Sequence, residues 1–129
     1  MNPLTITRRP CIALALAASF VVQAQTYPNQ AITLIVPFAA GGSTDIIARL
    51  TAEQMRKDMG QTVIVENIGG AAGALGTLQG AQAAPDGYTL TVTTVSTMIV
   101  YSATRSNPKY TLESFAPITN IASMPNILT

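Results

Sequence analysis

Residues 31–45 of the chain read AITLIVPFAAGGSTD. Residues 31–36 form a nearly continuous apolar run, which is typical of a strand buried on both faces of a sheet. The Gly41-Gly42 pair ends the extended segment, and Ser43 is expected to cap a helix by accepting a hydrogen bond from a backbone N–H group. Asp45 would lie in the first turn, where its charge suits the helix dipole. The stretch therefore predicts a strand, a loop and a helix in succession.

The same alternation continues down the chain. Apolar residues recur at helical spacing up to Met59, Glu53 and Lys57 form an i,i+4 pair, and Gly60 is expected to end the helix. The next expected elements are a second strand at 62–65, a glycine- and alanine-rich loop at 67–73, a second helix up to about Ala84, a Pro85-Asp86-Gly87 turn and a third strand at 88–93. This order predicts an α/β fold with a parallel sheet and right-handed crossovers.

The pattern is weaker in the last part of the chain. A short helix is expected at 97–105, and one helical turn capped by Thr111 at 111–115. A fourth strand is expected at 118–122. Residues 125–129 look like the start of another strand, so the chain is expected to end within an element.

The first 24 residues have the features of a secretory signal peptide. Arg8 and Arg9 supply the positive region, and the apolar run at 11–22 is too short to span a bilayer comfortably. Cleavage is expected between Ala24 and Gln25, which would leave no stable membrane anchor; the alternative is a buried N-terminal helix. Loss of the two arginines from the seven Lys and Arg leaves five cations against six Asp and Glu, a net charge of −1. The single Cys would leave as well, which suits an oxidising compartment.

The composition excludes several classes of function. The 129 residues fit one domain or a piece of one, and they contain no His and one Cys. The chain alone therefore cannot form a Ser-His-Asp triad or a Cys-His dyad, and a zinc site is not expected. A formal charge of +1 gives no broad basic face for nucleic acid.

Ligand binding is expected in the loops after the three strands, at 38–44, 68–73 and 94–97. Ligands of open parallel sheets bind at the carboxyl ends of the strands. Each loop leads into a helix N-terminus, where free N–H groups attract anions, and none contains Lys or Arg. This pattern favours a modest anion such as a carboxylate, held by amides, hydroxyls and water; no metal or other cofactor is expected. The candidate ligand-binding residues are Phe38, Ala39, Ala40, Gly41, Gly42, Ser43, Thr44, Asp45, Gly70, Ala71, Ala72, Gly73, Thr94, Ser96 and Thr97.

Nucleotide motifs and several single residues have simpler interpretations. Gly41-Gly42-Ser43-Thr44 lacks the Lys of a P-loop, and the glycines after the second strand do not follow Gly-x-Gly-x-x-Gly. The open alternatives are that Asp45 orients the loop or only complements the dipole, that Phe38 lines a cleft or only packs, and that Gly76 and Gly80 only let a helix approach the sheet. For Gly70 and Gly73 close approach of a ligand is favoured, Ser43 is expected to be a cap rather than a nucleophile, and Tyr88 is expected to pack on its strand.

Four segments in this order resemble the Bug (TctC-like) family, the extracytoplasmic solute receptors of tripartite tricarboxylate transporters. They are 27–45, 63–73, 83–90 with its Pro-Asp-Gly-Tyr-Thr-Leu sequence, and Phe115-Ala116-Pro117-Ile118. The chain departs from the family where Ala39-Ala40 stands for Pro-Pro, Ile68-Gly69 for Arg-Pro, Ala74 for Asn and Tyr101-Ser102 for Asn-Pro.

The resemblance implies a periplasmic-binding-protein type II fold with two α/β lobes around a cleft, of which this chain would be an incomplete part of the first lobe. It implies that the first two loops hold a ligand carboxylate, partly through ordered waters, and that the third lines the same cleft. A periplasmic receptor of this kind would deliver its solute to a membrane permease, or feed a sensory system, without chemistry on the solute. The alternatives are a secreted α/β hydrolase-like enzyme that uses Ser43 or Ser96 with a His from elsewhere, or a truncated product without function.

Overall fold

The computed structural model describes residues 26–123. The predicted signal peptide, its cleavage position at Ala24 and Gln25, and the strand expected at 125–129 lie outside these residues. Among the described residues, no helix is both long enough and apolar enough to cross a membrane.

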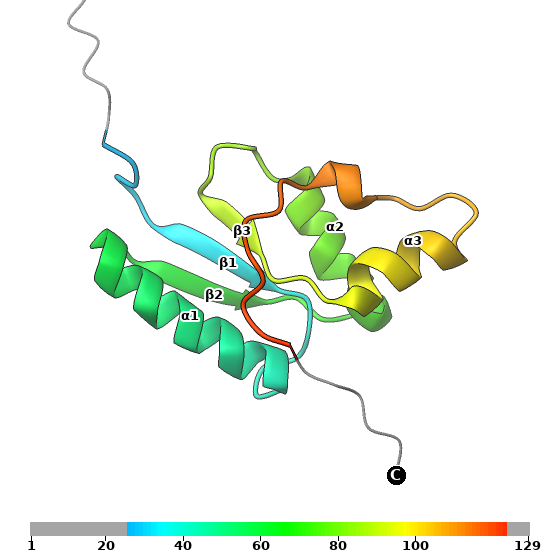
Figure 1. The fold of residues 1–129 in the computed structure, drawn as a ribbon, viewed down its shortest axis with the longest axis horizontal. Coiled ribbons are helices and arrows are strands. Elements are labelled where there is room, and N and C mark those ends of the chain that lie inside the picture. The colour runs from blue at the N-terminus through cyan, green and yellow to red at the C-terminus, as the bar shows by residue number, and fades with distance from the viewer. Residues whose placement is uncertain (1–25, 124–129) are drawn as a thin grey trace, which may run out of the picture.

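A three-stranded parallel sheet forms the centre of the protein (Figure 1). Its strands are β1 (Ile32–Val36), β2 (Val63–Asn67) and β3 (Thr89–Thr91), in the order β2-β1-β3. β1 is therefore the central strand. Its almost continuously apolar sequence follows from the burial of both of its faces by the helices on either side of the sheet. The predicted α/β fold and parallel sheet are confirmed, although β3 is shorter than the expected 88–93.

Two helices cover opposite faces of the sheet. α1 (Ser43–Met59) packs Ala48 and Ala52 against Leu34 and Val36 of β1. α2 (Ala74–Gln82) lies on the other face, since an added Cβ at Gly80 would meet the side chain of Thr91. Successive residues of each strand thus point alternately towards α1 and towards α2, as the pleat of a strand requires.

The ends of α1 test two sequence predictions. Gly60 ends the helix in the left-handed conformation, with φ of 67°, and its N–H donates to the Arg56 carbonyl at 3.1 Å, as predicted. The predicted cap is wrong by one residue. Gly42 occupies the capping position and its carbonyl accepts from the Ile46 N–H at 3.0 Å, so Ser43 is already the first helical residue.

A second apolar cluster forms after β3. The chain passes through a π-helical turn, η2 (Ser96–Val100), then α3 (Tyr101–Thr104), and later a 3₁₀ turn, η3 (Leu112–Ser114). Tyr110 is buried against Ala74 and Met98 and stacks on Tyr101 with ring centroids 4.4 Å apart. Its hydroxyl donates to the carbonyl of Thr97 at 2.7 Å. These contacts fasten the segment around Tyr110 to the helices beside the sheet.

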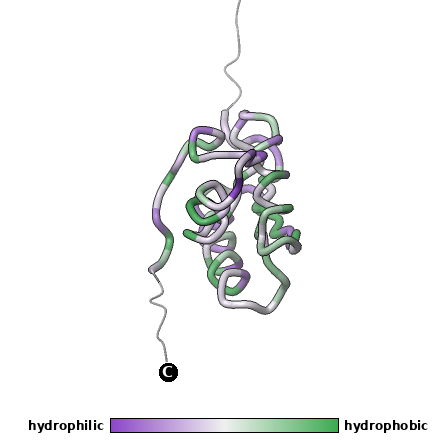
Figure 2. Tube along the Cα trace, turned by 90° about the vertical axis from the view of Figure 1, so that its right-hand side faces the viewer, coloured by the Kyte–Doolittle hydropathy of each residue, from purple (hydrophilic) through white to green (hydrophobic). Residues whose placement is uncertain are grey.

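The strand expected at 118–122 does not form. Residues 116–123 are exposed and pair with no described strand, and Figure 2 shows this segment, which leads to the C-terminus, standing beside the body of the protein. Apolar residues such as Ile118 and Ile121 indicate a strand, but a strand needs a neighbour to satisfy its backbone groups. No such neighbour lies alongside among the described residues.

The two outer strands lead to a prediction about solubility. β2 and β3 have no partner on their outer edges among the described residues, and Ile64 of β2 is 51% exposed. Open edges pair with other chains, so we expect residues 25–129, expressed alone, to self-associate as their concentration rises, and Ile64→Lys to reduce this. Size-exclusion chromatography with light scattering over a concentration series measures both effects. A monomer with a sharp cooperative melt at every concentration would contradict the prediction.

Candidate functional site

The loops after the three strands meet at one edge of the sheet. Because all three strands are parallel and β1 is central, the loop after β1 lies between the other two (Figure 1). Gly73 marks the point of contact. A Cβ added there would lie 2.5 Å from Cγ2 of Thr97, 3.2 Å from the Pro37 carbonyl oxygen and 3.3 Å from the Phe38 ring. The structure thus brings the three predicted ligand loops together.

Asp45 is hydrogen-bonded to the backbone of the loop after β1. It is only 3% exposed, and its carboxylate accepts from the N–H of Gly41 at 2.8 Å, Nε of Arg49 at 3.0 Å and Nδ2 of Asn67 at 2.9 Å. The hydrogen bond from Arg49 and then those from Gly41 and Asn67 lower the pKa of Asp45 to about 2. Of the two interpretations of Asp45, orientation of the loop is therefore supported by direct contacts. Arg49 also neutralises a charge that would otherwise repel an anionic ligand.

Asn67 is a site residue that the sequence did not reveal. It is the last residue of β2, and its Nδ2 donates to the carbonyl of Phe38 at 3.2 Å as well as to Asp45. Its Oδ1 accepts from Nη2 of Arg49 at 3.0 Å. Asparagine is uncommon in strands, and the sequence placed Asn67 in the loop at 67–73 without giving it a role. Its partners lie 18 to 29 positions away in sequence, so only the fold could identify them.

The loop after β2 has an unusual backbone. Gly70, Ala71, Ala72 and Gly73 all have positive φ, at 128°, 49°, 55° and 90°. Two consecutive alanines in the left-handed region are costly, and such strain concentrates at functional sites. Glycine at 70 and 73 is required by the backbone conformation itself, so the structure explains these glycines without a ligand.

The hydroxyl groups in the three loops are of two kinds: some form hydrogen bonds within the protein and others do not. The Thr97 hydroxyl accepts from the Thr94 N–H at 3.0 Å and donates to the Thr94 carbonyl at 3.1 Å, and Thr97 is only 1% exposed. It therefore braces the third loop. The hydroxyls of Ser43, Thr44 and Ser96 make no hydrogen bond to another described residue. They remain available as donors, and neither serine hydroxyl is hydrogen-bonded to a described residue that could act as a base.

Exposure sorts the predicted site residues further. Phe38, Thr44 and Thr94 are half-buried and Asp45, Gly73 and Thr97 are buried, while the remainder are exposed: Ala39, Ala40, Gly41, Gly42, Ser43, Gly70, Ala71, Ala72 and Ser96. Phe38 packs against the cluster between β1 and α1. The exposed surface consists of backbone amides, small side chains and hydroxyls, without Lys or Arg. No group of three or more acidic or Cys side chains that could hold a metal occurs within 26–123.

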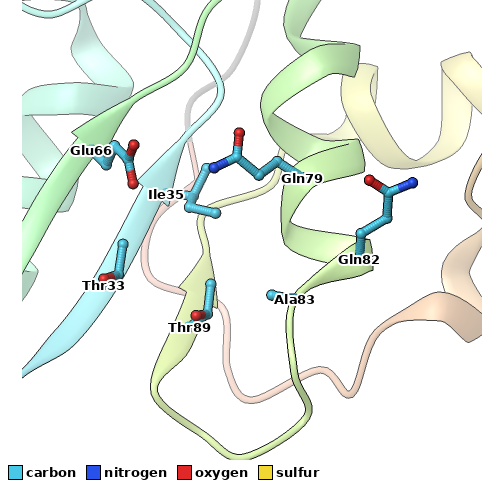
Figure 3. Close-up of a pocket in the computed structure, with 7 residues that line it drawn as sticks. All are labelled: Thr33, Ile35, Glu66, Gln79, Gln82, Ala83 and Thr89. Carbon is cyan, nitrogen blue, oxygen red and sulfur yellow. The ribbon is translucent and has the colours of Figure 1, made fainter. Parts of the chain in front are cut away.

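A separate hollow lies away from the three loops. It has a volume of about 360 Å³ and lies on the α2 face of the sheet, where Thr33, Glu66 and Thr89 from the strands face Gln79 and Gln82 of α2 (Figure 3). The carboxylate of Glu66 makes this hollow unsuitable for an anion. The edge with the three loops is therefore the better candidate site.

An open parallel sheet, covered on both faces and with cation-free loops at its carboxyl edge, is typical of α/β proteins that bind a ligand at that edge. Residues 47–129 match the family model described as "Tripartite tricarboxylate transporter family receptor". The chain belongs to this family.

Curated relatives agree with this assignment. The chain is 40% identical over 109 residues to protein BugT of Bordetella pertussis, covering 83% of this chain and 33% of BugT. It is 42% identical over 119 residues to a protein from the TAR-I ttuE-ttuC' intergenic region of Agrobacterium vitis, covering 88% of this chain and 34% of that protein. The chain thus spans about a third of the length of these relatives.

Solved structures show the same fold. A periplasmic transporter is 56% identical with a TM-score of 0.64, and MatC from Rhodopseudomonas palustris with bound malate is 41% identical with a TM-score of 0.62; each match covers 66% of this chain and 29% of the other. Another R. palustris protein, solved with adipate, is 36% identical with a TM-score of 0.53, covering 54% of this chain and 23% of the other. The described residues therefore form part of a periplasmic-binding-protein lobe.

Proposed function

We propose that this chain supplies the ligand-holding edge of a periplasmic receptor for a small carboxylate of the malate and adipate type. The observation that carries the proposal is the meeting of three cation-free loops at Gly73. Helix N-termini and hydroxyls can hold a carboxylate without a paired cation, because the exposed N–H groups carry partial positive charge. The ligands of MatC and of the adipate-bound relative support the same chemistry.

The proposal includes the rest of a two-lobed receptor. Solute receptors of this fold close two lobes around a ligand, and this chain matches only 29% of MatC. The half of the cleft described here would bind weakly alone, because the opposite contacts and the exclusion of water would be missing. In the complete receptor, the signal peptide at 1–24 would direct secretion to the periplasm, and a membrane permease of a tripartite tricarboxylate-type transporter would take up the solute.

A chimera tests the ligand class. Residues 26–123 replace the matching segment of MatC, and malate binding is measured by isothermal titration calorimetry. We expect malate affinity within about tenfold of MatC, because 1.4 kcal/mol covers modest changes in loop sequence. We also expect Ser43→Asp to weaken malate binding at least about tenfold by charge repulsion, although Asp in the first turn favours the helix.

Ser43→Asn is the matched control, since it has nearly the same size as Ser43→Asp without the charge. Its malate affinity should stay within about threefold of the parent chimera. A folded parent chimera that binds no carboxylate, or equal affinities for the Asp and Asn variants, would refute the proposed site.

A further inference from the structure

Asn67 joins the first two ligand loops. Asn67 is the last residue of β2 and directly precedes the loop at 68–73. Its side-chain amide donates a hydrogen bond to the Phe38 carbonyl, in the loop after β1, at 3.2 Å. Both of its polar atoms are occupied, because Oδ1 accepts from Arg49 at 3.0 Å and Nδ2 also donates to Asp45 at 2.9 Å. A side chain with both a donor group and an acceptor is required to satisfy this set of partners.

The loop after β1 is consequently held at two backbone points. Asn67 holds the carbonyl of Phe38, and Asp45, which Asn67 itself contacts, holds the N–H of Gly41 at 2.8 Å. The exposed stretch between these points contains Ala39 and Ala40, which are small side chains that cannot fix the loop by packing. The polar contacts beneath the loop therefore set where its amides point.

The sheet itself does not depend on this amide. Asn67 pairs with Val36 through the backbone ladder, and the next residue, Ile68, donates its N–H to the Val36 carbonyl at 2.9 Å. Removal of the Asn67 side chain leaves both of these intact. Loss of the amide should thus act on the loop after β1 more than on the strands.

We propose that Asn67 is a positioning residue, which holds the Phe38 carbonyl and the Asp45 carboxylate so that the loop after β1 presents its amides to the ligand. This inference rests on the proposed function in that the presented ligand is a small carboxylate. Asn67 does not touch the ligand itself. It sets the spacing between the first two loops.

The first test needs no ligand. Amide hydrogen exchange is measured at single-residue resolution on the whole chain at sub-micromolar concentration, for the parent, Asn67→Ala and the isosteric Asn67→Asp. We expect the Gly41 amide to exchange about tenfold faster in both variants, and the Ile68 amide to exchange at the parent rate. The matched control is Gln54→Ala, which removes an amide–carboxylate bond of 2.9 Å to Asp58 on the exposed face of α1. Gln54→Ala should leave the exchange rates of both the Gly41 and the Ile68 amide unchanged.

The second test measures malate affinity in the chimera. Asn67→Ala should weaken binding about tenfold at a temperature where the variant is fully folded, and Gln54→Ala should not. Equal acceleration of the Gly41 and Ile68 amides would show a purely structural role and overturn the inference, as would no acceleration or unchanged malate affinity. If the parent chimera binds no carboxylate, the proposed function fails, and the amide comparison alone still decides whether Asn67 positions the loop.

Discussion

A single methyl group added at Gly76 is expected to lower the free energy of unfolding by about 2–3 kcal/mol. The new Cβ would lie 2.5 Å from the carbonyl oxygen of Ile68 and 2.9 Å from Cα of Pro37. Both are backbone atoms at the edge of the sheet, so no side-chain rotation relieves the contact and α2 must move away from the sheet. The gain of up to about 1 kcal/mol from replacing a helical glycine with alanine is too small to offset this. Urea denaturation of the chimera measures the change.

Gly69→Ala is the matched control for Gly76→Ala. Its added Cβ would have its nearest contacts at 3.6 Å from the Ala39 nitrogen and 3.8 Å from the Phe38 carbonyl carbon, which are ordinary van der Waals distances. The control should change the unfolding free energy by no more than about 0.5 kcal/mol. Equal stability of the two variants would show that α2 does not pack as closely on the sheet as the structure indicates.

The second large effect is expected at Asp45. Asp45→Asn keeps the size of the side chain but replaces one acceptor oxygen with an NH₂ group, which would face donors from Arg49, Asn67 or Gly41. We expect the melting temperature of the chimera at pH 7 to fall by roughly 5–10 °C, because buried donors are left without acceptors. Asp58→Asn is the control, since Asp58 is exposed on α1 and accepts from Gln54. It should shift the melting temperature by less than about 2 °C.

The effect of Asp45 should depend on pH in a defined direction. The folded protein lowers the pKa of Asp45 from 3.8 to about 2, chiefly through the hydrogen bond from Arg49 and then through Gly41 and Asn67. The unfolded chain therefore binds the proton more readily, and the stabilisation is complete above about pH 5 and lost as the pH falls through 4 towards 2. Melting curves across this range should show the parent and Asp45→Asn converging at low pH. A constant difference would contradict this account.

Local signals in the sequence predicted much of the fold. The apolar run of β1, the left-handed Gly60 and the Pro85-Asp86-Gly87 turn each act through the conformational preferences of a few neighbouring residues, and each marked a real element or boundary. The role of Gly76 and Gly80 in letting a helix approach the sheet was also confirmed. The strand expected at 118–122 was wrong, because pairing depends on a neighbour and not on composition.

The candidate site divides in the same way. Its place in the loops after the strands followed from the α/β alternation, and the sequence also shows that those loops contain no Lys or Arg. The structure then showed that Thr97 braces its own loop, and that Asp45 reaches Gly41. Whether a hydroxyl or carboxylate forms hydrogen bonds within the protein or is available to a ligand depends on its neighbours in space.

By itself, the sequence determined the order of strands and helices, the cation-free character of the loops and the resemblance to a family of solute receptors. Only the tertiary structure decided the strand order β2-β1-β3, the meeting of the three loops at Gly73 and the contacts of Asn67 with Phe38 and Asp45. The physical reason is the range of the interactions. Backbone preferences and helix caps act over a few residues, whereas the hydrogen bonds that shape the site join groups that only the folded sheet brings together.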